Sequence, residues 1–81
     1  MSLFKKKEYI IYRLNIEGMR CGMCESHINN VIRNNFKVKK VTSNHYKNET
    51  LIYSINELDI NKIKEVIAPT GYILKEIKKE N

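Results

Sequence analysis

The chain has two cysteines, Cys21 and Cys24, and their spacing is the clearest sign of chemistry in the sequence. With two residues between them, a bend can bring both thiols to one side of a loop. Thiolate sulfur selects Cu(I), Zn(II) and similar soft or borderline ions over magnesium and calcium. Cys24 is also expected in the first turn of a helix, where backbone N–H groups and the helix dipole favour the thiolate. The pair is therefore predicted to bind a metal ion or to react.

The length and composition limit the kind of protein that carries this pair. With 81 residues, one proline and three glycines, the chain is expected to form a single domain over residues 1–81, with an ordered core at about residues 8–79. Arg13 interrupts the apolar run Ile10-Ile11-Tyr12, which excludes a secretory signal there. No stretch approaches the roughly 20 apolar residues of a membrane-spanning helix, so no membrane insertion is expected. We expect a cytosolic location, where paired thiols indicate metal or redox chemistry.

The charge pattern raises a second possibility. The net charge is +6, and lysines gather at residues 5–7, 37–40 and 75–79. A basic surface attracts nucleic acid or an acidic partner. However, the sequence has neither the aromatic signature of RNA-recognition proteins nor an arginine-rich stripe. A basic nucleic-acid-binding module is therefore the weaker alternative to a solvated, lysine-rich surface.

The hydrophobic pattern predicts six elements. Alternating and β-branched runs indicate four strands, and apolar residues at helical spacing indicate two helices. Asp59 suits the N-cap of the second helix, and Pro69 suits its end. The expected order is strand, helix, strand, strand, helix, strand, at residues 8–17, 24–35, 38–46, 50–55, 60–67 and 72–79.

This order predicts a ferredoxin-like βαββαβ fold of the α+β class, with a four-stranded antiparallel sheet and two helices on one face. A right-handed first crossover places the third strand between the first two, and the fourth strand beside the first. Three connections then share one end of the sheet: the cysteine loop, the hairpin at residues 47–49 and the turn at residues 69–72. Gly71 and Tyr72 are expected near the cysteines, and the hairpin farther away at the sheet edge.

Two segments carry a resemblance to a known family: Gly18-Met19-Arg20-Cys21-Gly22-Met23-Cys24 before the first helix, and Ala68-Pro69-Thr70-Gly71-Tyr72 before the last strand. They resemble the heavy-metal-associated domain, the fold of copper chaperones and of the N-terminal modules of heavy-metal-transporting P-type ATPases. The resemblance extends over about residues 8–79. It implies a metallochaperone-like protein of metal ion transport, not an enzyme, that holds one soft ion, first of all Cu(I). The implied partner is a metal-transporting P-type ATPase or another Cys-x-x-Cys protein.

The same resemblance implies roles for individual residues. Cys21 and Cys24 would bind Cu(I) through sulfur in near-linear geometry. Met19 would be buried under the loop, and Tyr72 would shield the ion. Arg20 departs from the family pattern, in which a small polar residue is usual and many zinc or cadmium members have Asp. Its charge would partly neutralise the negative bis-thiolate site, and the lack of Asp disfavours Zn(II).

The number of donors gives a separate argument about the metal. Structural Zn(II) usually takes four ligands, whereas this loop offers two thiolates. His27 is the nearest candidate for a further ligand, although an exposed helix histidine without a metal role is the simpler interpretation. Zn(II) or another soft metal, in a binding or sensing domain, remains the alternative to Cu(I).

A thiol-redox protein is another alternative, but a thioredoxin-like fold is larger and its motif lacks the flanking Gly-Met. Three side chains near the loop have simpler explanations than metal binding. Met23 is expected to be exposed, Glu25 to favour the helix dipole, and His45 to be structural or exposed in the hairpin. The sequence also leaves open whether the chain is a free chaperone or an ATPase module. It is expected to be a monomer, with a metal-bridged dimer as a further form.

Overall fold

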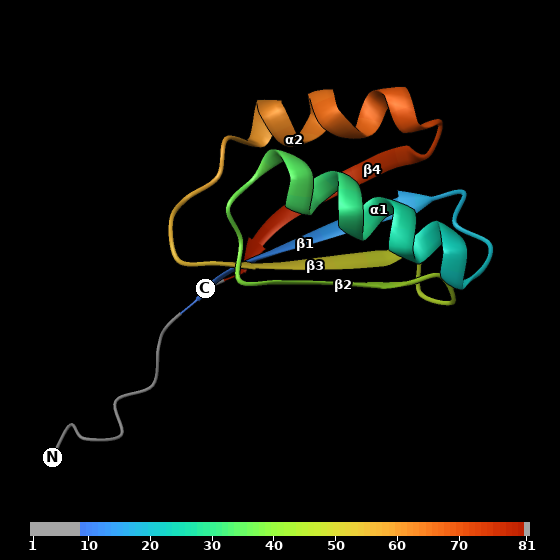
Figure 1. The fold of residues 1–81 in the computed structure, drawn as a ribbon, viewed down its shortest axis with the longest axis horizontal. Helices are drawn as coiled ribbons and strands as arrows, with labels where there is room; N and C mark the ends of the chain where they lie inside the picture. The colour runs from blue at the N-terminus through green and yellow to red at the C-terminus, as the bar shows by residue number, and fades with distance from the viewer. Residues whose placement is uncertain (1–8, 81) are drawn as a thin grey trace, which may run out of the picture.

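Four strands form one antiparallel sheet, and both helices lie on the same face of it (Figure 1). This is a computed structural model, and it describes residues 9–80. The elements are β1 (Ile10–Glu17), α1 (Gly22–Asn35), β2 (Lys40–Asn44), β3 (Glu49–Ser54), α2 (Ile60–Ile67), the short 3-10 turn η2 (Ala68–Thr70) and β4 (Ile73–Glu80). The strand order is β2-β3-β1-β4. The ferredoxin-like fold and its sheet order are therefore confirmed.

Alternation along the strands places one face of each strand under the helices. Tyr12, Leu14 and Ile16 of β1 are buried, as the apolar pattern predicted. The helices contribute buried residues at helical spacing, and β2 and β3 add one apolar side chain each; these residues are Ile28, Ile32, Ile63, Ile67, Val41 and Ile52. Burying each such aliphatic side chain stabilises the fold by about 1.5–3 kcal/mol relative to leaving it in water. The core thus lies between the sheet and both helices.

Local side-chain contacts explain several element boundaries. The Asp59 carboxylate accepts hydrogen bonds from the backbone N–H groups of Asn61 and Lys62, at 2.9 and 3.3 Å, which confirms it as the N-cap of α2. α2 ends at Ile67, and η2 follows with Pro69 inside it. Gly71 then takes φ +90°, a left-handed conformation that glycine adopts without a Cβ clash. The connection turns there and returns the chain to the sheet as β4.

Several element ends differ from the sequence-based expectation by one or two residues, including the start of β2 at Lys40 instead of residue 38, and local contacts explain two of the differences. α1 begins at Gly22, not Cys24, because Cys21 is extended (φ −164°) and its carbonyl accepts the first helical hydrogen bonds. β2 ends at Asn44, not residue 46, because the Asn44 side chain accepts from the N–H groups of Tyr46 and Lys47 and so forms the hairpin turn locally. The expected start of the first strand at Glu8 lies outside the described residues.

The three connections predicted to meet do lie at one end of the sheet. In Figure 1 the β1–α1 loop, the β2–β3 hairpin and the α2–β4 turn are all on the right. Antiparallel pairing of β4 with β1 brings Ile73 opposite Glu17, so the residues that follow β1 lie beside those that precede β4. Within residues 9–80, none of the helices has the length and apolar character needed to cross a membrane.

Candidate metal centre

The loop that holds the cysteines begins with a glycine that the geometry requires. Gly18 has φ +106°, and a Cβ added there would lie 3.3 Å from Cδ1 of the Tyr72 ring. Both the left-handed backbone and the close approach of the ring favour glycine at this position. The absence of a side chain at Gly18 therefore lets Tyr72 lie directly against the loop.

The two cysteines are free thiols with unequal surroundings. Cys21 is exposed and occupies the N-cap of α1, whereas Cys24 is half-buried in the first turn. The backbone N–H groups of Cys24 and Glu25 donate to the Cys21 carbonyl, at 3.1 and 3.2 Å. The start of the helix thus holds the two sulfurs at its N-terminal end, where anions are stabilised. The expected position of Cys24 in the first turn is confirmed.

The surroundings of Cys24 favour its thiolate. Its pKa is lowered from 9.0 to about 7, first because the Tyr72 hydroxyl donates a hydrogen bond to the sulfur, and then because the Arg20 backbone N–H does so. Cys21 adds smaller contributions through its backbone and side chain, while burial opposes the shift. The pKa of Tyr72 is raised by the same hydrogen bond, so the phenol keeps its proton and remains the donor. A lowered thiol pKa makes a sulfur a better metal ligand at neutral pH.

The residues beside the two cysteines, Met19, Arg20 and Met23, differ in their burial and in their contacts with the site. Met19 is only 5 % exposed and packs into the core, which is the position expected for it. Met23 lies between the cysteines and is 81 % exposed, also as expected. Arg20 is exposed, and it lowers the pKa of Cys24 through its backbone N–H; its guanidinium charge is not among the causes. The predicted effect of that charge on a metal-loaded site stays a prediction.

His27 lies next to the loop but faces Tyr72. Its Nδ1 is 3.4 Å from the Tyr72 hydroxyl oxygen, and the two rings meet edge to face with centroids 5.5 Å apart. In the part of the chain that the structure describes, no three His, Cys, Asp or Glu side chains form a group able to hold a metal ion. The two thiols therefore stand as a pair, and His27 as a further ligand stays a prediction.

Sequence reasoning missed a contact between Glu25 and His45. Glu25 Oε2 accepts a hydrogen bond from the backbone N–H of His45 at 2.8 Å and lies 2.7 Å from its Nδ1. These contacts lower the pKa of the Glu25 carboxyl. The hairpin was expected at the sheet edge, farther from the cysteines than Gly71 and Tyr72, and the strand order confirms its place at the edge. What the sequence did not predict is that His45 reaches Glu25, the residue after Cys24. The sequence predicted that the cysteine loop, the hairpin and the turn before β4 share one end of the sheet. That prediction does not specify which side chains of the three connections meet.

The sequence matches the family model of the heavy-metal-associated domain over residues 13–72, which is well over half of the chain. The chain belongs to this family. As a heavy-metal-associated domain it is a small metal-binding module of the class found in metal transporters and metallochaperones. Among curated proteins, none matches the sequence significantly.

Solved structures of the same family have a similar fold. The yeast copper transporter domain Ccc2a, solved in the apo and Cu(I)-loaded states, is 28 % identical with a TM-score of 0.73, over 88 % of this chain and 99 % of that one. The CopZ metallochaperone is 27 % identical, with a TM-score of 0.69, over 80 % and 98 %. The Zn(II) form of the ZntA N-terminal domain is 18 % identical, with a TM-score of 0.70, over 89 % and 93 %. At that identity the ZntA domain shows a common fold only.

Proposed function

We propose that this heavy-metal-associated domain binds one Cu(I) ion between Cys21 and Cys24 and passes it to a partner with its own Cys-x-x-Cys pair. A metal-transporting P-type ATPase is the partner that the family suggests. The observation that carries the proposal is the pair of free thiols at the N-terminus of α1, one of them with a pKa near 7, without a third grouped donor in residues 9–80. Two soft thiolates suit Cu(I), whereas structural Zn(II) usually needs four ligands.

The unequal exposure of the two sulfurs supports transfer rather than storage. Cys21 is exposed, so an incoming thiolate can reach the ion on that side, while Cys24 is held by Tyr72 and by backbone N–H groups. The ion can therefore gain a sulfur from the partner before it loses one from this domain. In this proposal Cys21 leaves first and Cys24 last.

The similarity to Ccc2a supports copper as the cargo, since that domain is known in a Cu(I)-loaded state and shares 28 % of its residues with this chain. The role requires both thiols to be reduced, so we place the protein in the cytosol, where thiols stay reduced. Zn(II) is the alternative cargo. It would need additional donors, and His27 is the nearest imidazole to the loop through its contact with Tyr72.

A competition between the two ions tests the proposal. The apo protein is titrated under anaerobic conditions with Cu(I) and, separately, with Zn(II), each against a chromophoric chelator. We expect one Cu(I) per chain and an affinity for Cu(I) that exceeds that for Zn(II) by orders of magnitude. A matched control is Met23→Leu, which changes the exposed residue between the cysteines and should leave Cu(I) binding unchanged. Equal or tighter binding of Zn(II) contradicts the copper assignment, and loss of that Zn(II) binding in His27→Ala identifies the recruited ligand.

Transfer is tested with a second copy of the domain as the acceptor. Unlabelled, Cu(I)-loaded protein is mixed with ¹⁵N-labelled apo protein, and the amide signals of residues 18–25 are followed. We expect the amide signals of the labelled loop to move to the positions of the Cu(I)-loaded protein. The exchange is repeated with a chelator that captures free Cu(I) but is too weak to remove the ion from the protein, and this chelator should not slow the exchange. Exchange that stops when such a chelator is present indicates release into solution and contradicts direct transfer.

A further inference from the structure

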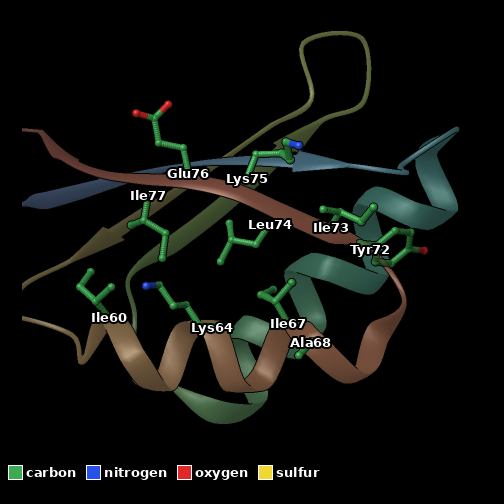
Figure 2. Close-up of a pocket in the computed structure, with 10 residues that line it drawn as sticks. All are labelled: Ile60, Lys64, Ile67, Ala68, Tyr72, Ile73, Leu74, Lys75, Glu76 and Ile77. Atoms are coloured by element: carbon green, nitrogen blue, oxygen red, sulfur yellow. The ribbon is translucent and has the colours of Figure 1, made fainter.

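A groove of about 580 Å³ runs along the outer side of α2, between that helix and β4 (Figure 2). Its walls are mostly aliphatic. Ile60 and Ile67 contribute from α2, and Leu74 and Ile77 from β4. Ile73, at the end of the groove near the loop, is 57 % exposed. Apolar side chains that line an open groove mark a surface that a partner can cover.

The groove lies at the β4 edge of the sheet, and the pocket that lines the β2 edge is smaller, about 240 Å³. At the other edge, α1 packs against β2, and the Ser43 hydroxyl donates to the Asn29 side chain at 2.7 Å. At this edge β4 pairs only with β1 among the described strands. Alternate backbone groups on the outer side of β4 are therefore available to another strand.

Three charged residues line the groove, Lys64 from α2 and Lys75 and Glu76 from β4, and the side chains of Lys75 and Glu76 point away from α2 (Figure 2). In Figure 2, Lys64 extends from α2 toward β4, between Ile60 and Leu74. Within residues 9–80, the ion pairs involve Arg13, His45 and Lys79, and Lys64 takes part in none of them. Lys64 is exposed, so water screens its charge in the free protein. A segment that covers the groove excludes this water, and the attraction between the ammonium group and a carboxylate then becomes stronger because the local dielectric constant falls.

The groove also reaches the proposed metal site. Tyr72 lines one end of it, and the Tyr72 hydroxyl donates to the sulfur of Cys24. An occupant of the groove therefore touches a residue that contacts a ligand of the ion. A partner bound there would be placed beside the loop with its own thiols near the exposed Cys21.

We propose that this groove binds an extended segment of the metal-exchange partner, with aliphatic side chains on either side of an acidic one, laid along the outer edge of β4. The inference rests on the proposed function, because that function defines the partner. The lining residues of α2 and of the first position of η2 run from Ile60 to Ala68, about 12 Å at the helical rise. At about 3.3 Å per residue this length accommodates roughly five residues of a strand, of which three alternate side chains enter the groove.

The positive charge near the groove disfavours two other occupants, a second copy of this chain and the chain's own N-terminal segment. Two copies of this chain paired along β4 would bring Lys64 of each copy into the same groove region, beside a strand whose three lysines outnumber its two glutamates. The N-terminal segment of the chain contains Lys5, Lys6 and Lys7, which have the same charge as Lys64. An acidic, apolar segment is the occupant that complements both the walls and the cation.

A peptide titration tests this inference. The probe is the synthetic peptide Val-Thr-Glu-Thr-Val, acetylated and amidated, in which both valines and the glutamate lie on one face of a strand. It is added to ¹⁵N-labelled protein, and amide shifts are recorded. We expect the shifts to concentrate in α2 and β4, with at least tenfold weaker binding in Lys64→Glu. The same peptide with glutamine for glutamate should also bind more weakly, and one with lysine should bind Lys64→Glu better than the wild type.

Two matched controls separate the groove from general charge or hydrophobicity. Lys39→Glu makes the same charge change at an exposed position before β2, at the other edge of the sheet, and should alter binding less than twofold. Ile73→Ser should weaken binding severalfold, whereas Ile55→Ser should not, although Ile55 is 48 % exposed. Equal effects of Lys64→Glu and Lys39→Glu, or of the two serine variants, overturn the proposal. Shifts that spread over the helix-free face of the sheet, or that appear with protein concentration alone, overturn it as well.

Two variants test the groove inference and the proposed Cu(I) binding separately. Peptide binding is repeated with the Cys21→Ser, Cys24→Ser double variant, and Cu(I) binding is repeated with Lys64→Glu; both activities should survive. Cu(I) binding without any peptide binding overturns the groove inference and leaves the proposed function intact. Peptide binding without Cu(I) binding by the wild type overturns the proposed function instead.

Discussion

The cysteine loop and the core beneath it adjoin each other at Met19 but differ in almost every physical property. In the loop, Cys21 and Met23 are exposed, and hydrogen bonds to one sulfur dominate the contacts. In the core, Leu14 and Ile28 have no exposed surface, and apolar packing dominates. A binding site of two sulfurs adds little buried area, so stability should come from the core and metal affinity from the loop. The predictions below test this separation.

The largest effect is expected from Cys21 and Cys24, the proposed ligands. Cys21→Ser or Cys24→Ser each replaces a soft thiolate with a hydroxyl, and Cu(I) affinity should fall by orders of magnitude. The free energy of unfolding of the apo protein should change by about 1 kcal/mol or less, because Cys21 is exposed and Cys24, which packs against the core, is replaced by a side chain of nearly the same shape. Chelator competition measures the first quantity, and urea unfolding followed by circular dichroism measures the second. An unfolded serine variant would show that the loop is part of the stable fold.

The second-largest effect is expected in the core, where a substitution should lower stability and leave Cu(I) affinity unchanged. Leu14→Ala leaves a cavity in the core, and such truncations lower stability by about 2–5 kcal/mol. Where the variant is still folded, its Cu(I) affinity should stay close to that of the wild type. Ile73→Ala is the matched control, because Ile73 is 57 % exposed and its truncation should cost less than about 0.5 kcal/mol. A loss of metal affinity as large as in the serine variants would mean that core and site are coupled.

A smaller effect is expected where the loop meets the last strand. Tyr72→Phe removes the hydroxyl that lowers the pKa of Cys24, so that pKa should rise from about 7 toward 9.0. The pH midpoint of Cys24 alkylation, resolved by mass spectrometry, should rise accordingly. Arg20→Thr is the control and should leave the midpoint nearly unchanged, because the Arg20 contribution comes from its backbone N–H. A larger shift in Arg20→Thr than in Tyr72→Phe would assign the effect to the guanidinium charge.

The smallest effect is expected at the contact between α1 and the hairpin. Glu25→Gln weakens the contact with His45 and should lower the melting temperature slightly, without loss of Cu(I) binding. His45 lowers the pKa of Glu25, so the stabilisation is present above the ordinary carboxyl value of 4.5 and is lost as the pH falls through the lower folded-state pKa. Melting curves between pH 7 and pH 3 should therefore converge for the two proteins. Curves that diverge on acidification would contradict the assigned sign.

The cysteine loop and the core also differ in how much of their structure could be predicted from the sequence. The alternation of Tyr12, Leu14 and Ile16 predicted the buried face of β1, and Asp59 predicted the start of α2; both are confirmed. Such signals are local, because a strand has period two and a cap bonds within three residues. The start of α1 at Gly22 was not predicted, since it depends on how the Cys21 backbone meets the helix.

By itself the sequence determined the element order, the apolar faces, the cysteine pair at a strand–helix junction and the resemblance to the heavy-metal-associated domain. Those properties depend on residue type and short-range spacing. Only the tertiary structure decided that Tyr72 donates to Cys24, that Glu25 meets His45 and that Lys64 stands in an apolar groove beside β4. Each of these depends on side chains that are far apart along the chain. Their meeting is set by how helices and strands pack and rotate against one another, which local periodicity does not specify.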